Sequence, residues 1–201
     1  PAKRVSYTKL QRALEEAIRK CLFSNETVGV SFSGGVDSGT IAFWARKMRR
    51  DIVLVCVGTE NSLDLTRAEK YAKKWKMKLV KKILTKKDIE NNYALAQKVL
   101  QTTDTLQLTL GTVNLSIAQC AHDAGIKTLL VGSGADELFC GYGIFDTLRD
   151  SEEKCEKQRN EKVKNVNAHD VTREKKCAAK YGITIHTPYL DETFSSEALL
   201  I

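Results

Sequence analysis

A six-residue loop, Ser-Gly-Gly-Val-Asp-Ser, gathers side chains that can bind phosphate and a cation. Ser33 and Ser38 carry hydroxyl donors, and the pair Gly34 and Gly35 allows positive φ and a close approach of the backbone to a ligand. Asp37 can hold the Mg²⁺ that accompanies a nucleotide. Because an expected strand precedes the loop and an expected helix follows it, orphan N–H groups and the helix dipole would converge on an anion. The loop therefore predicts a phosphate site rather than an ordinary turn.

A second loop of the same character, Gly-Ser-Gly-Ala-Asp-Glu, follows another apolar run and begins at Gly132. Ser133 and Gly134 offer a hydroxyl and a flexible backbone, and Asp136 lies where the next helix is expected to begin. A Gly-x-Gly pattern alone is weak evidence, but two such loops on neighbouring strands can hold the two ends of a triphosphate. We expect the first loop to take the α- and β-phosphates and the second loop to take the departing pyrophosphate.

The elements expected to position these loops alternate between strands and helices, because apolar β-branched runs alternate with stripes of helical period. Strands are expected at 28–32, 51–57, 78–83 and 128–131, and helices at 8–22, from 37 onward, and at 64–75, 86–100, 109–124 and 170–181. The alternation predicts an α/β fold with a doubly wound, mostly parallel, Rossmann-like sheet, whose ligand lies past the carboxyl ends of its strands. Val57 and Gly58 end the second strand, where they would either contact an adenosine or only turn the chain. Both readings stay open.

Composition indicates one globular domain over residues 1–201. The chain has 201 residues, 42% of them hydrophobic, and shows neither an internal repeat nor a linker. Charged residues crowd the stretch 149–168, for which a solvated helix, a mobile lid or both remain open.

Charge and cysteine usage limit the classes of partner. The net charge of +7 suits an anionic ligand, and nucleic acid is disfavoured because the lysines are interleaved with acids and no aromatic-rich basic patch is evident. No apolar stretch of membrane-spanning length and no secretory signal is evident. The six cysteines form no C-x-x-C pair, which argues against a zinc or iron–sulfur site and suits free thiols. We expect a cytoplasmic protein without a membrane partner.

The first loop resembles the PP-loop of the ATP pyrophosphatases, which cleave ATP between its α- and β-phosphates; unlike a Walker loop, it has no Lys after its glycines. The chain as a whole is similar to the C-terminal synthetase domain of asparagine synthetase B and its relatives, including β-lactam synthetase. The matching stretches, in order, are 33–38, Val57-Gly58 with Asp64, 132–137 with Gly141-Tyr142, and 188–191. The resemblance implies ATP and Mg²⁺ as cofactors and adenylation of a small carboxylate, which an amine then attacks.

The resemblance also implies roles for single residues. It assigns Ser33, Gly34, Gly35 and Ser38 to phosphate, and Ser133, Gly134 and Asp136 to the pyrophosphate side, with Asp136 counted as catalytic. Asp37 and Asp104 match magnesium ligands, although Asp104 in a polar turn also suits a helix N-cap. Lys176 falls where the family has a lysine that stabilises charge in the transition state. The adjacent Lys175 leaves the register open, and a surface lysine is the plain alternative.

Three departures from the family pattern bear on the reaction. By position, a general-base glutamate is expected at residue 101, where the chain has Gln101, and an amide cannot take a proton at neutral pH. His186 stands where the family has an arginine. The chain begins at Pro1, shortly before its first expected helix, so we expect the glutaminase domain to be lacking. Free ammonia, a separate glutaminase subunit or a different amine remain open as nitrogen sources.

The leading hypothesis is therefore an ATP-dependent, AMP-forming ligase that joins a small carboxylate to ammonia or another amine. A PP-loop enzyme that adenylates a tRNA base would need salt-sensitive tRNA affinity. A non-catalytic ATP-binding subunit would bind ATP without turnover. The oligomeric state, including a homo-oligomer, stays open.

Overall fold

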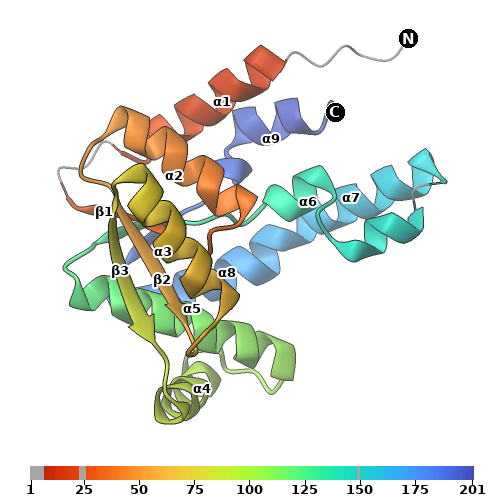
Figure 1. Cartoon of the computed structure of the whole chain (residues 1–201). Helices are drawn as coiled ribbons and strands as arrows, with labels where there is room; N and C mark the ends of the chain where they lie inside the picture. The colour runs from red at the N-terminus through yellow and green to blue at the C-terminus, as the bar shows by residue number, and fades with distance from the viewer. Residues whose placement is uncertain (1–6, 23–25, 149) are drawn as a thin grey trace.

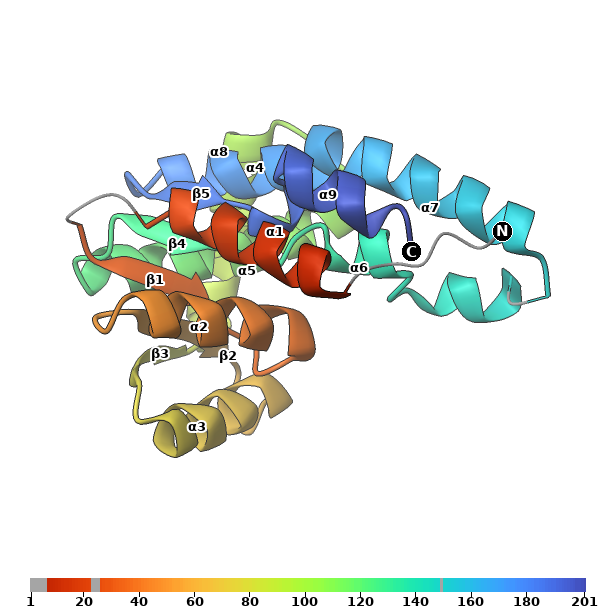
Figure 2. The ribbon, with the colours of Figure 1, turned by 90° about the horizontal axis from the view of Figure 1, so that it is seen from above.

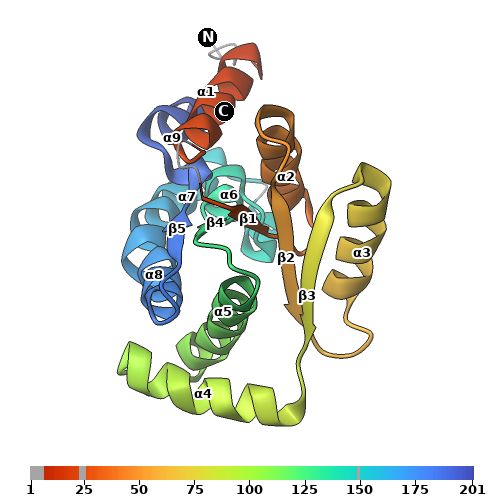
Figure 3. The same ribbon diagram turned by 90° about the vertical axis from the view of Figure 1, so that its left-hand side faces the viewer.

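The computed structural model describes residues 7–22, 26–148 and 150–201. Its centre is one five-stranded sheet of order β3-β2-β1-β4-β5, in which all neighbouring strands are parallel (β1 to β3 are labelled in Figure 1 and all five strands in Figure 3). The strands are β1 (Val28–Ser31), β2 (Val53–Gly58), β3 (Lys78–Ile83), β4 (Thr128–Leu130) and β5 (Thr184–His186). The predicted doubly wound α/β fold is confirmed.

Helices cover both faces of this sheet (Figure 3). They are α1 (Tyr7–Lys20), α2 (Val36–Met48), α3 (Leu63–Trp75), α4 (Lys86–Leu100), α5 (Thr105–Asp123), α6 (Ala135–Phe139), α7 (Glu152–Val166), α8 (Thr172–Ala179) and α9 (Glu192–Ala198). One buried cluster joins the sheet to α1, α2, α3 and α9, and a second joins it to α5 and α8. Helix α4 packs outside α5, and α1 lies beside α9 (Figure 2).

Strand β2 shows why the sheet is buried on both sides. Leu54 and Cys56 belong to the cluster under α1 and α2, whereas Val53, Val55 and Val57 belong to the cluster under α5. Successive side chains of a strand point to opposite faces, so a continuous apolar run fills two cores at once. The parallel sheet follows directly from this run.

The strand order places the ligand crevice. The chain runs outward from β1 through β2 to β3 on one side, and β4 and β5 lie on the other side. Strand order therefore reverses between β1 and β4, and in such sheets ligands bind at the carboxyl ends of the strands beside this switch point. Because β1 pairs directly with β4, the loops that follow them are neighbours, as the sequence predicts.

Several boundaries differ from the sequence expectations. Helix α5 begins four residues early, at Thr105, because Asp104 caps it. The strand β5 was not predicted; its three residues pair with β4 from Thr128 to Leu130. Within the charged stretch, 152–166 forms α7, which continues through a π-helical segment (Asn167–Val171) into α8. Residues 1–6, 23–25 and 149 of the proposed domain lie outside the described residues.

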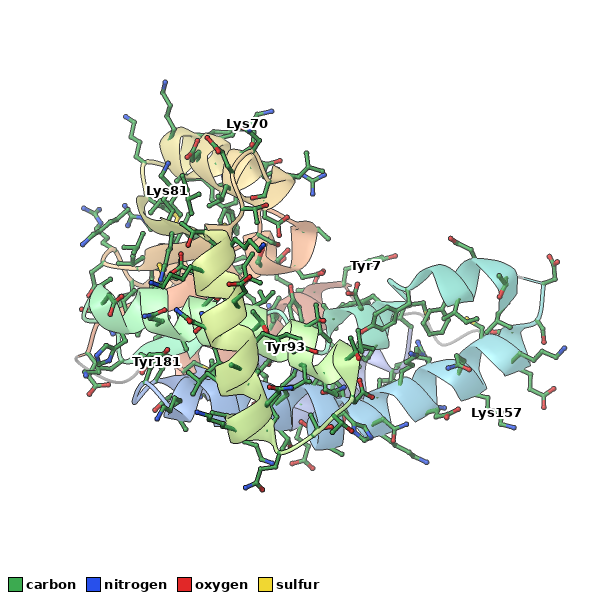
Figure 4. All side chains as sticks on the ribbon, turned by 90° about the horizontal axis from the view of Figure 1, so that it is seen from below. Tyr7, Lys70, Lys81, Tyr93, Lys157 and Tyr181 are labelled. Carbon is green, nitrogen blue, oxygen red and sulfur yellow. The ribbon has the colours of Figure 1, made fainter. Side chains whose placement is uncertain are left out.

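Basic side chains are distributed over several elements. Lys70 on α3, Lys81 on β3 and Lys157 on α7 point outward from different parts of the molecule (Figure 4). Lys81 forms an ion pair with Glu69 of α3. The described helices include none that is long and apolar enough to cross a membrane.

Candidate functional site

The loop between β1 and α2 presents an uncapped helix N-terminus. Gly35 is the N-cap residue of α2, with φ −74° and ψ 172°, and therefore supplies no side-chain acceptor to the first turn. The orphan N–H groups of that turn, together with the helix dipole, favour an anion. Ser33 Oγ and Ser38 Oγ lie 3.3 Å apart beside them, so two hydroxyls can turn toward the same ligand.

Gly34 is required by the packing of this loop. Its φ is +75°, and a Cβ atom there would lie 2.4 Å from Arg67 Cβ and 3.1 Å from the Arg67 carbonyl carbon. These neighbours belong to α3 and cannot move without the helix. The loop is thus pressed between α2 and α3 in a conformation that L side chains rarely adopt.

The second loop touches the first. A Cβ atom on Gly132 would lie 3.4 Å from Asp37 Cβ. Gly134 has φ +100° and its Cβ position is 2.5 Å from Leu190 Cδ2, so only glycine fits against the short helix Pro188–Leu190. From that same helix, the Tyr189 hydroxyl donates to the Asp37 carbonyl oxygen at 3.0 Å. One 3₁₀ turn therefore supports both loops.

A cavity of about 430 Å³ lies where the two loops meet. It is lined by Ser31, Ser33, Gly35, Asp37, Ser38, Leu110, Gly132, Ser133, Gly134, Asp136, Glu137, Tyr142, Val166, Asp170, Arg173 and Glu174. Seven of the residues predicted from sequence, Ser33, Gly35, Asp37, Ser38, Ser133, Gly134 and Asp136, are thus brought to one place.

The charge in this cavity is strongly negative. Burial, and then the nearby carboxylates of Asp136 and Glu137, raise the pKa of Asp37. Arg173 is the one basic residue in the lining, and it is 6% exposed. Its guanidinium is already paired with Asp170 at 2.7 Å and donates to side-chain oxygens of α5. A polyphosphate entering this cavity would therefore need to bring cations.

The acidic lining fits a magnesium ion that arrives with a nucleotide. Asp37 and Asp136 both line the cavity, near enough for their charges to interact, and they offer the oxygen ligands that Mg²⁺ prefers. Within the described residues there is no cluster of three or more His, Cys, Asp or Glu side chains that could hold a metal ion. The remaining ligands would thus be phosphate oxygens and water, as is usual for Mg²⁺ at nucleotide sites.

Five of the predicted residues do not line this cavity: Gly34, Val57, Gly58, Asp104 and Lys176. Gly34 borders a separate pocket lined by aromatic side chains of α2 and α3. Val57 is buried, and the Gly58 carbonyl oxygen accepts from the Leu84 N–H at 2.8 Å. A Cβ atom on Gly58 would lie 2.3 Å from Ser62 Oγ, so the turn itself requires glycine. An adenosine contact at Val57 and Gly58 stays a prediction.

Asp104 acts as a helix cap in this structure. Its side chain accepts from the Gln107 N–H at 3.0 Å, it is exposed, and it is not part of the cavity lining. Gln101 lies in the same connection, exposed, with φ +52° as the C-cap of α4. Asp104 thus has the capping role that was weighed for it, and its magnesium role stays a prediction.

Helix α8 turns different residues to the cavity than the sequence suggested. Lys175 and Lys176 are exposed, whereas Arg173 and Glu174 line the cavity. Burial and then the charge of Lys175 lower the pKa of His186. The sequence held a signal for this orientation, because Glu174 lies four residues before the small, buried Ala178 and therefore shares its helix face. The neighbouring lysines made this signal easy to miss.

Two comparisons with known sequences place the chain in a family. The model of the asparagine synthase family matches residues 9–166. A putative glutamine-hydrolysing asparagine synthetase of Methanocaldococcus jannaschii is 34% identical over 194 residues, which are 96% of this chain and 36% of that protein. The asparagine synthetase of Asparagus officinalis is 27% identical over 202 residues, with 96% and 34% of the two chains covered. The chain thus spans about a third of the length of these relatives.

Among solved structures, an NH₃-dependent NAD synthetase from Campylobacter jejuni is similar at a TM-score of 0.47 and 17% identity, covering 68% of this chain and 60% of that one. The family match extends over most of the chain and includes both glycine-containing loops. The chain belongs to the asparagine synthase family.

Proposed function

We propose that the protein is an ATP-dependent, AMP-forming carbon–nitrogen ligase. It would adenylate a small carboxylate and pass the acyl group to ammonia or another amine. The observation that carries this proposal is the meeting of two phosphate-type loops at the switch point between β1 and β4. Membership of the asparagine synthase family supports the same reaction class.

The two loops would bind different phosphates of ATP. The N-terminus of α2, with Ser33 and Ser38, would hold the α- and β-phosphates, and Ser133 with Gly134 would hold the pyrophosphate that leaves. Mg²⁺ held by Asp37 and Asp136 would neutralise charge that develops on the phosphates. Holding the α-phosphorus open to a carboxylate oxygen lets a carboxylic acid be activated without a covalent link to the protein.

The acidic lining also bears on the carboxylate substrate. Glu137 and Asp170 lie on the side of the cavity formed by α6, α7 and the π-helical segment, and Tyr142 donates a hydrogen bond to Glu137. Carboxylates at this position attract an ammonium group. A substrate that carries both an ammonium and a carboxylate, such as an amino acid, therefore fits better than a simple acid.

The nitrogen source is part of the proposal. The relatives from M. jannaschii and A. officinalis are described as glutamine-hydrolysing. This chain matches only a third of their length, so we propose that the part described here uses ammonia itself. A glutaminase activity, on this polypeptide or on a separate subunit, would supply that ammonia.

Carboxylate-dependent exchange of labelled pyrophosphate into ATP tests the proposal. A panel of amino acids, with aspartate first, should include one that supports exchange in the presence of Mg²⁺. Asp37→Asn should abolish exchange, whereas Asp123→Asn, an exposed change at the end of α5, should leave it unchanged. Formation of ADP, or ATP binding without exchange over the whole panel, would contradict the proposal. Exchange that requires tRNA would favour the base-adenylating alternative.

A further inference from the structure

A smaller cavity of about 100 Å³ lies behind the phosphate cavity, between α5, α8 and the end of β4. The two cavities share Ser31, Gly132, Ser133 and Glu174 in their walls. The rest of the smaller cavity is mostly apolar, lined by Ile117, Ala118, Leu129, Val131, Ala178 and Ile185, with Asn114 as the other polar side chain. Ser133 and Glu174 thus form a polar partition between the two spaces.

Glu174 brings an incompletely satisfied carboxylate to this partition. Its Oε1 accepts from Ser133 Oγ at 2.6 Å. Its Oε2 is buried and has no hydrogen-bond partner in the described part of the chain. Buried polar atoms are almost always paired, so an orphaned carboxylate oxygen beside a cavity indicates a missing donor.

Among the described residues, no basic side chain donates to Oε2. The neighbouring Arg173 directs its guanidinium to Asp170, Asn114 and Gln107 instead. A space of about 100 Å³ would hold only a very small ligand, since one water molecule occupies about 30 Å³ in the liquid. The ligand must be small, must donate hydrogen bonds and must suit a negative charge. Ammonium meets all three conditions.

We propose that the cavity between α5 and α8 binds the nitrogen nucleophile as ammonium, and that Glu174 takes its proton. This inference rests on the proposed function and deepens it. The proposal assigns the general base to Glu174 on α8 rather than to residue 101, because Gln101 lies exposed in the connection between α4 and α5. Glu174 reaches the phosphate cavity through its hydrogen bond to Ser133, so the nitrogen would be delivered beside the activated acyl group.

The chemistry balances with these groups alone. Ammonium gives one proton to Glu174 and becomes NH₃, whose lone pair forms the new C–N bond with the acyl carbon of the adenylate. The C–O bond to AMP breaks, and its electron pair leaves with the AMP phosphate. That phosphate takes the second proton shed by the nitrogen. A base placed in this way contributes about 10²–10⁴-fold to such a step.

The experiment separates the two halves of the reaction in Glu174→Gln. Ammonium-dependent amide formation should fall about 100-fold or more. Pyrophosphate exchange should fall far less, because the amide oxygen of the variant can still accept the hydrogen bond from Ser133. Glu156→Gln, an exposed change on α7, is the matched control and should lose neither activity. Hydroxylamine, which is unprotonated at neutral pH, should restore acyl transfer in the variant, because it needs no base.

Different failures have different meanings. Absence of exchange in the wild-type protein would refute the proposed function. Normal exchange with normal amide formation in Glu174→Gln would refute only the ammonium site. Loss of both activities together, or no advantage of hydroxylamine over ammonium, would also refute it, because Glu174 would then only support the loop at Ser133.

Discussion

Replacing Gly34 by alanine tests whether α3 presses the phosphate loop into its shape. The left-handed φ of +75° costs a residue with a Cβ about 1 kcal/mol. The contact of 2.4 Å with Arg67 Cβ adds overpacking, typically about 1–3 kcal/mol. Together, Gly34→Ala should lower the free energy of unfolding by about 2–4 kcal/mol.

Two other glycines separate these contributions. Gly125 has φ +73° but no atom within 4 Å of its Cβ position, so Gly125→Ala should cost only the backbone part, about 1 kcal/mol. Gly143 has neither a positive φ nor a neighbour within 4 Å, and Gly143→Ala should be neutral or slightly stabilising. Urea unfolding of the three variants gives the comparison directly.

The affinity for Mg-ATP is the second property to measure in the same variants. Displacing the loop moves the N–H groups at the start of α2, so Gly34→Ala should weaken binding of Mg-ATP at least tenfold, about 1.4 kcal/mol. Gly125→Ala should bind as wild type does. Equal unfolding energies for Gly34→Ala and Gly125→Ala would refute the steric argument. Unchanged ATP affinity in Gly34→Ala would refute the placement of the phosphates.

Further predictions concern the cap, the base and the α4–α5 connection. Asp104→Ala should lower the free energy of unfolding by about 1 kcal/mol, because α5 loses its cap. The Mg²⁺ dependence of pyrophosphate exchange should stay the same, and a changed dependence would support the metal role of Asp104. Burial raises the pKa of Glu174, so protonated Glu174 stabilises the folded protein at low pH and this contribution is lost as the pH rises through the folded pKa. Glu174→Gln should therefore gain stability relative to wild type as the pH rises above the ordinary glutamate range, measured by thermal unfolding, and a constant difference would contradict this. Gln101→Glu should leave the amide-forming rate unchanged, because Gln101 is exposed at the C-cap of α4; a clear rate increase would place the base there.

The pH prediction depends on the charges around Glu174. The hydrogen bond from Ser133 and the charge of Arg173 lower the pKa of Glu174, while Asp170 and Glu137 raise it. Desolvation outweighs them and sets the direction of the shift upward.

The sequence predicted the sheet and its loops well because their signals are local. A continuous apolar run such as Val53–Gly58 predicts a strand that is buried on both faces of a parallel sheet. A glycine pair at the end of a strand predicts a loop. The side-by-side placement of the two loops also followed from the strand alternation. It is confirmed by the pairing of β1 with β4.

The parts that escaped prediction depend on tertiary context. Strand β5 has only three residues, too few to show a period, and it forms because β4 offers a free edge. On α8, the sequence favours the lysines as phosphate ligands, because they carry positive charge. Packing against α5 instead turns Arg173 and Glu174 toward the cavity. In the sequence, the metal role of Asp104 was only somewhat ahead of the cap, and the cap becomes visible only once the start of α5 is placed at Thr105.

Transfer of ¹⁸O from a labelled carboxylate tests the central claim most directly. If a carboxylate oxygen attacks the α-phosphorus in the cavity beside Ser33 and Asp37, amide formation must leave one labelled oxygen in AMP, detectable by mass spectrometry. Label in inorganic phosphate, with ADP as the other product, would show attack at the γ-phosphorus. That result would contradict the account of how the two loops hold ATP.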